Sequence, residues 1–206
     1  EGVGLRLSFM SNQTDGWAFN RIRNARDGKD HYWGARAVLV LEPTPDIKAV
    51  LRAQYFKGGS DPIMVKSTPG RASLPTGFIP AADLAALQAS YGFTGAAAAS
   101  NFYTIENDMP GLEEMEHIPV SLNIDVNLGG VTLTSTTGFL NVNQKFALDD
   151  DGTSVPLLGE YDKHSNRQWT QELRLASNGD GPLQWILGGF YMHEKIKADL
   201  YFHSTE

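Results

Sequence analysis

The chain has 206 residues and a formal net charge of −7, from 17 basic and 24 acidic residues. This acidic balance, without a basic stripe, disfavours nucleic acid as a partner. Cysteine is absent, which excludes disulfides, cysteine-based zinc sites and a thiol nucleophile.

Seven segments alternate between apolar and polar residues with the period of two that predicts β-strands. In the clearest, every even position from Val120 to Leu128 is apolar and every odd position from Ser121 to Asn127 is polar. In chain order the predicted strands are about Val3–Ser11, His31–Glu42, Ile47–Lys57, 117–128, Val131–Phe139, Gln168–Ser177 and Leu183–Glu194, the last of which can run on to Phe202.

The predicted connections alternate in length along the chain. Pro43–Asp46, Gly129–Gly130 and Asn178–Pro182 read as short turns, and Gly-Gly is a hairpin signal. The other three connections, about 12–30, 58–116 and 143–167, are predicted to be long, and Pro80–Ser90 within the middle one favours a short helix. Short turns at one end and long outer loops at the other are typical of an outer-membrane barrel, although a soluble sandwich can imitate them.

Large aromatic residues support the membrane interpretation. Trp33, Tyr55, Phe139, Trp169 and Tyr191 all fall near the long-loop ends of their strands and on the apolar face. Such a ring on the outer face is the interfacial girdle of a transmembrane barrel. The alternative is that these side chains cover the rim of a sandwich core.

The sequence therefore predicts an all-β fold, an antiparallel up-and-down transmembrane barrel. Seven strands are an odd number with unpaired edges, and open edges do not occur in lipid, so residues 1–206 are interpreted as an incomplete portion of a larger barrel. The longest apolar run, Ala37–Leu41, is far too short for a spanning helix. Charges on the polar face are predicted to face the lumen, where they form salt bridges; the main ones are Arg36, Arg52, Asp125, Glu172 and Arg174.

Two stretches, Trp169–Ser177 and Pro182–Tyr191, resemble the middle of the barrel of TonB-dependent outer-membrane receptors, with Gln171–Arg174 followed by Trp185 as the most specific part. The resemblance implies a plugged 22-stranded barrel in a Gram-negative outer membrane, whose plug lies outside this chain. It implies TonB-driven import of a scarce nutrient, such as a ferric siderophore, haem, cobalamin or an oligosaccharide. Outer-membrane lipid, the TonB complex and the nutrient would be the partners.

Few residues point to chemistry. No catalytic signature is present, the five histidines have no metal-ligand spacing, and we predict no enzyme, no metal and no cofactor. Asp149–Thr153 resembles part of a calcium loop with the wrong spacing, so a solvated outer loop is expected and ion binding stays open. Candidate ligand-binding residues in the outer loops are Phe93, Phe102, Tyr103 and His164, although the aromatic ones can equally form the small core of their loop.

Two other functions stay open at this point. One is a soluble all-β binding module, such as a carbohydrate-binding sandwich, in which the apolar faces meet across a closed core and bury Leu122, Ile124 and Leu173. The other is a non-transporting surface protein built on a barrel.

Overall fold

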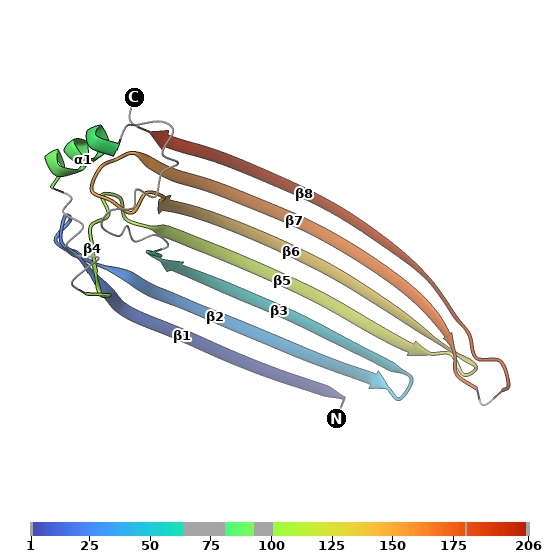
Figure 1. The fold of residues 1–206 in the computed structure, drawn as a ribbon. Helices are drawn as coiled ribbons and strands as arrows, with labels where there is room; N and C mark the ends of the chain where they lie inside the picture. Colours follow the sequence, from blue (N-terminus) through green and yellow to red (C-terminus); the bar gives the residue numbers. More distant parts are fainter. Residues whose placement is uncertain (1, 64–80, 93–100, 180, 205–206) are drawn as a thin grey trace.

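The computed structural model describes residues 2–63, 81–92, 101–179 and 181–204. Seven long strands and one short strand form a single curved sheet, and one helix lies at its end (Figure 1). The elements are β1 (Val3–Asn20), β2 (Ala25–Thr44), β3 (Ile47–Ser60), α1 (Ala81–Ser90), β4 (Thr104–Ile105), β5 (Leu112–Asn127), β6 (Val131–Asp149), β7 (Leu158–Ser177) and β8 (Ile186–Ser204).

The sheet is an antiparallel meander, with the order β4-β1-β2-β3-β5-β6-β7-β8. The predicted all-β class is therefore confirmed, and each of the seven predicted strands overlaps a long strand. Segment 117–128 ends one residue beyond β5, and Leu183–Glu194 begins three residues before β8. The eighth, β4, has two residues and pairs in parallel with the end of β1, which the sequence did not predict. The sheet does not close on itself, and no second sheet packs against it among the described residues.

The three connections predicted to be short lie together at one end of the sheet: β2–β3, β5–β6 and β7–β8 (Figure 1). The first two are tight, whereas the third spans residues 178–185 and is longer than predicted. In the β5–β6 turn Gly129 has a φ of 84°, which glycine adopts without strain because it lacks a Cβ. At this turn the Leu128 N–H donates to the Val131 carbonyl over 2.9 Å.

Two of the three predicted long loops are wrong. Segments 12–30 and 143–167 are mostly strand, since β1 and β2 are joined by residues 21–24, and β6 and β7 by 150–157. Apolar–polar alternation disappears from these sequences although hydrogen-bonded pairing continues. Buried positions there are filled by polar side chains, such as Asn20 and Asp27, as well as by apolar ones such as Ala18. The 58–116 segment does contain a long connection, between Ser60 and Leu112, with α1 inside it.

The buried core of the described residues lies at the loop end of the sheet. It consists of residues from the ends of β1, β4 and β6 and from the β6–β7 connection: Ala18, Ile105, Ala147, Leu148, Val155 and Leu157. Across the middle of the sheet, Val50 is the one buried apolar residue among those described. The described helix is not of the length and apolarity that crossing a membrane requires.

Candidate functional site

The five predicted girdle residues share one face of the sheet. Phe139 pairs with Trp169 across β6 and β7, and the Trp169 ring centroid lies 5.6 Å from that of Tyr191. On the other side of β5, the rings of Trp33 and Tyr55 are 4.9 Å apart, and Phe9 stacks on Trp33 at 6.4 Å. The alternation places them on the same face as the apolar residues of β5. These side chains therefore form one row across the sheet, which we call the aromatic row. Its position on β5 is filled by Ile118 instead of an aromatic residue.

The aromatic row does not run perpendicular to the strands. The perpendicular row of paired residues through Trp33 reaches β8 at Lys197, six residues from Tyr191, after five steps between neighbouring strands. At about 3.3 Å per residue and about 4.8 Å per strand, this displacement is a slope of about 40°. If the aromatic row is taken as horizontal, the strands are therefore tilted by about 40° from the vertical.

The aromatic row also marks a boundary. On the short-turn side, the same face is apolar on β2 from Ala35 to Leu41. On the loop side, the face becomes polar and charged, with Lys57 and Arg167 in the next positions of β3 and β7, and His193 followed by Lys195 on β8. Apolar, aromatic and charged zones therefore follow one another along the strands.

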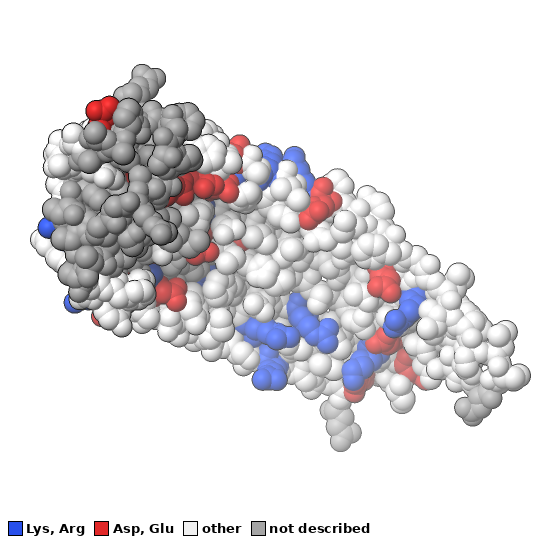
Figure 2. Space-filling model, viewed as in Figure 1, with Lys and Arg blue, Asp and Glu red and all other residues white. Residues whose placement is uncertain are grey.

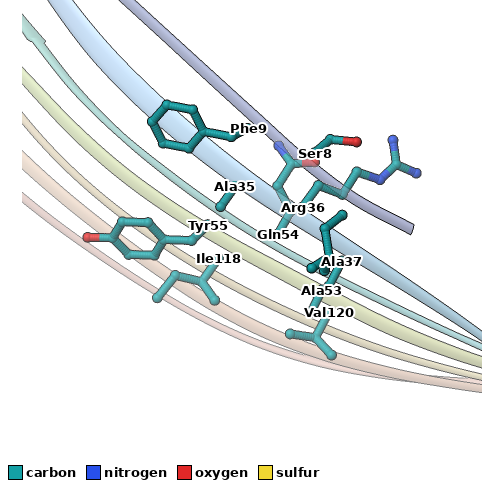
Figure 3. Close-up of a pocket in the computed structure, with 11 residues that line it drawn as sticks. Ser8, Phe9, Ala35, Arg36, Ala37, Ala53, Gln54, Tyr55, Ile118 and Val120 are labelled. Atoms are coloured by element: carbon teal, nitrogen blue, oxygen red, sulfur yellow. The ribbon is translucent and has the colours of Figure 1, made fainter. Parts of the chain in front are cut away.

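A shallow groove of about 620 Å³ crosses the apolar face over four strands. Figure 3 shows the rings of Phe9 and Tyr55 at one end of it with the small side chain of Ala35 between them, and Ala37, Ala53 and Val120 at the other end. Small residues on β2 and β3 between larger ones on β1 and β5 thus create a depression lined by apolar groups.

The predicted lumen-facing charges share the opposite face. One row across the sheet carries Lys48, Asp125 and Arg174, with Thr134 between the last two and donating to Asp125 over 2.7 Å. The expected salt bridges are partly present: Lys48 pairs with Glu42 at 2.6 Å. Figure 2 shows this face, with basic side chains over the middle of β1–β3 and mixed charges nearer the short turns. The polar-face positions of β1, β2 and β3 carry three basic residues, Arg6, Arg36 and Arg52. Glu172 lies on the same face of β7, two residues from Arg174.

At the loop end, two of the predicted binding residues come together. The Phe102 ring stacks on Trp17 with centroids 5.5 Å apart, and Tyr103 packs edge-on against both. All three side chains are exposed, so they form a surface and not a loop core. The sequence reasoning missed Trp17 because it placed that residue in a loop.

The structure does not bring His164 into this cluster. His164 lies on β7, where it contacts Asp162, and four strands lie between β7 and β1. Phe93 lies outside the described residues.

The Asp149–Thr153 segment is not a solvated loop, which corrects the sequence prediction. Asp149 and Asp151 are buried, and Asp151 accepts hydrogen bonds from the backbone N–H of Thr153 and of Leu158. Burial, with the nearby Asp151 and Asp108 carboxylates, raises the pKa of Asp149 to about 8. Burial likewise raises the pKa of Asp151. The β6–β7 connection folds back through its own backbone donors, so it encloses these acids.

No protein-family model matches this chain, and neither the curated proteins nor the solved structures contain a match to it.

Proposed function

We propose that this chain is part of the barrel domain of an outer-membrane, TonB-dependent receptor that imports a scarce nutrient. The slope of the aromatic row is the observation that carries the proposal. Outer-membrane barrels have strands tilted by about 35–45° and aromatic girdles at the edge of the apolar band, so a level girdle crosses their strands obliquely, as this row does.

The height of the apolar zone supports the same conclusion. Trp33 and Leu41, the ends of the apolar run on β2, are eight residues apart. That spacing is about 26 Å along the strand and about 20 Å along the normal to a level girdle, to which the terminal side chains add. The lipid-facing band of outer-membrane barrels is about 25 Å tall.

The open edges also favour a larger barrel. The free edges of β1 and β8 carry unpaired backbone groups, and each such group costs several kcal/mol in hydrocarbon. Further strands would pair with these edges and close the wall. A soluble sandwich gains no support, because Leu173 is 51% exposed and no described sheet covers it.

The polar face would then line a lumen filled by a plug, and the plug would contact the TonB complex. The exposed aromatic cluster of Trp17, Phe102 and Tyr103 would meet the nutrient at the outer mouth. Ferric siderophores, haem, cobalamin and oligosaccharides all offer flat or apolar surfaces to such rings. The apolar groove would hold acyl chains of the outer membrane, and the protein would have no catalytic role.

Because the chain has no cysteine, single cysteines can report on each face. We would introduce Ile124→Cys and, as its matched neighbour, Asn123→Cys, in the receptor folded in lipid vesicles. An environment-sensitive dye at position 124 should be quenched by brominated acyl chains, while position 123 should react with a water-soluble thiol reagent. Equal quenching at both positions, or a water-soluble monomer without detergent, would contradict a membrane barrel.

A second experiment addresses transport. Cells that lack this receptor should grow poorly on one limiting nutrient out of iron chelates, haem, cobalamin and oligosaccharides, and should lose energy-dependent uptake of it. Growth and uptake equal to those of the parent strain on all four would instead favour a non-transporting surface protein on the same barrel.

A further inference from the structure

Five basic residues lie on the loop-side halves of β6, β7 and β8, on the same face as the aromatic row. We call them the basic patch: Lys145, Lys163, Arg167, Lys195 and Lys197. The three strands pair without a register shift, so the face of each residue follows from the alternation that starts at Phe139, Trp169 and Tyr191. All five side chains are exposed.

The acids of the same strand segments lie mainly on the other face. Glu160, Asp162 and Glu194 occupy positions that alternate with those of the basic patch. Beyond the aromatic row, Asp199 is the one exposed acid that the described residues of these three strands place on the patch face, where it lies opposite Lys163. The basic patch therefore carries a clear excess of positive charge.

Like charges also face each other within the basic patch. Arg167 is directly opposite Lys195, and Lys145 is directly opposite Lys163. Like charges in such positions destabilise a sheet.

The protein compensates only part of this repulsion. Lys145 pairs with Glu114 on β5 at 2.8 Å. Arg167 and Lys163 lie on β7, both of whose neighbouring strands are described, and in the described part of the chain neither forms an ion pair. An exposed set of cations with this arrangement favours an external anion as its partner.

The height of the basic patch indicates the kind of anion. Lys145, Lys163 and Lys197 each lie six residues beyond the aromatic-row residue of their own strand, so they are level with one another on three neighbouring strands. With the strand tilt of about 40°, they lie about 15 Å above the aromatic row, whereas Arg167, two residues beyond Trp169, lies about 5 Å above it. The positive charge therefore spans about 10 Å beyond the apolar zone.

A lipid with a single phosphate at the membrane interface would reach only the lower part of this span. A lipid whose headgroup is a sugar with several anionic groups would reach all of it. Tyr161 and Tyr201 lie just beyond the basic patch on the same face, with ring centroids 6.2 Å apart. Their exposed rings offer apolar faces and hydroxyl groups to such a sugar.

We propose that the basic patch binds the phosphorylated sugar headgroup of an anionic glycolipid, whose acyl chains lie on the apolar zone below. Arg167 would hold a phosphate with two parallel hydrogen bonds close to the aromatic row, and the three level lysines would contact the anionic groups further out. The bound lipid would offset the repulsion among β6, β7 and β8. This inference rests on the membrane placement proposed above.

The test compares two lipids added to the receptor in detergent, with binding followed by titration and by native mass spectrometry. The probes are a deep-rough lipopolysaccharide, which carries several anionic groups on its sugars, and phosphatidylglycerol, which carries one phosphate. We expect lipopolysaccharide to bind the parent at least tenfold more tightly. Lys163→Gln combined with Lys197→Gln should raise its apparent Kd about 30-fold, or about fivefold for each lysine. Arg6→Gln combined with Arg52→Gln removes the same charge from the polar face and should bind as the parent does.

Each variant also carries Ile124→Cys, so that quenching by brominated acyl chains in vesicles reports membrane insertion separately. Normal quenching with unchanged lipopolysaccharide affinity in the double lysine variant would overturn this inference and leave the membrane barrel standing. Equal affinity of the parent for phosphatidylglycerol would overturn the glycolipid assignment, as would retention of an acidic protein in place of lipid. Absence of quenching in the parent would overturn both proposals.

Discussion

The sheet contains two regions that depend on different surroundings. From the short turns to the aromatic row, the strands present an apolar face without a protein core beneath it, and most of its side chains are half-buried or exposed. Beyond the row, the loop end has the buried side chains and nearly all of the buried polar groups. It also has residues 103–111, the crossing segment, which backbone hydrogen bonds join to the end of β1 and to the β6–β7 connection. The first region exposes an apolar surface that no described part of the protein covers, whereas the second is stabilised by side chains buried within the protein.

This difference teaches that one sheet can be stabilised by two separate mechanisms. Mutations in the apolar zone should change how the protein enters or stays in lipid. Mutations at the loop end should loosen local structure and leave the wall intact. The following predictions, from the largest expected effect to the smallest, would break or sharpen the division.

Ile105→Ala should have the largest effect, a loss of about 2–5 kcal/mol from the loop end, because Ile105 is 2% exposed and its truncation leaves a cavity. Hydrogen exchange should accelerate in the crossing segment and in residues 150–157. The paired short-turn halves of β3 (Ile47–Ala53) and β5 (Val120–Val126) should keep their protection, and a uniform acceleration would contradict the division. Leu5→Ala, on the apolar face, is the matched control.

Leu122→Arg should destabilise the inserted protein by about 2–4 kcal/mol, because position 122 lies midway along the apolar run of β5 and would place a cation in lipid. Asn123→Arg, one residue along and on the polar face, should insert almost as the parent does. Folding into vesicles over a urea series measures both. Equal losses in the two variants would show that the faces do not differ in surroundings.

Asn20→Ala should cost about 1–3 kcal/mol, less than the loss of Ile105, because it removes hydrogen bonds from buried groups. Asn20 Nδ2 donates to Asp27 and to the Asn107 carbonyl, and its Oδ1 accepts from the N–H groups of Ile22 and Arg23. Thermal unfolding of the loop end, followed by Trp17 fluorescence, measures the loss. Asn12→Ala on the same strand, where the side chain is exposed, should change it little.

The smallest effect belongs to the exposed ion pair of Glu114 with Lys145, at 2.8 Å. Lys145 lowers the pKa of Glu114, so the stabilisation is present above the ordinary pKa of 4.5 and is lost as the pH falls through the lowered value. The Tm difference between the parent and Lys145→Gln should therefore be constant near neutral pH and vanish in acid. It should also shrink in high salt, and a difference that persists in acid would refute the pairing.

The sequence was informative wherever one face of a strand is apolar and the other is polar. Alternation identified the apolar zone, its register and the shared face of Trp33, Tyr55, Phe139, Trp169 and Tyr191. It gave no signal for the outer halves of β1, β2, β6 and β7, because polar residues such as Asn20, Asp27 and Asp149 occupy buried positions there. The aromatic cluster was only partly predicted, since Trp17 joins Phe102 through pairing between segments far apart in the chain.

The acids at the loop end were misread for a related reason. Three consecutive aspartates favour solvent when read locally, and burial of Asp149 and Asp151 depends on donors from Gly152, Thr153 and Leu158 and on a crossing segment about forty residues away. Long-range coverage of this kind leaves no periodic trace in the sequence. The predicted charges of the polar face, by contrast, lie where the alternation placed them.

The short strand β4 limits what can lie beside β1. It already occupies the backbone donors at Phe19 and Arg21 on the outer edge of β1. Any neighbour that pairs with that edge must therefore stop before Phe19, whereas a neighbour of β8 can continue to Ser204. The strand pairings at the two edges of this sheet would consequently extend to different heights, and the rim of a closed barrel would be lower at β1 than at β8.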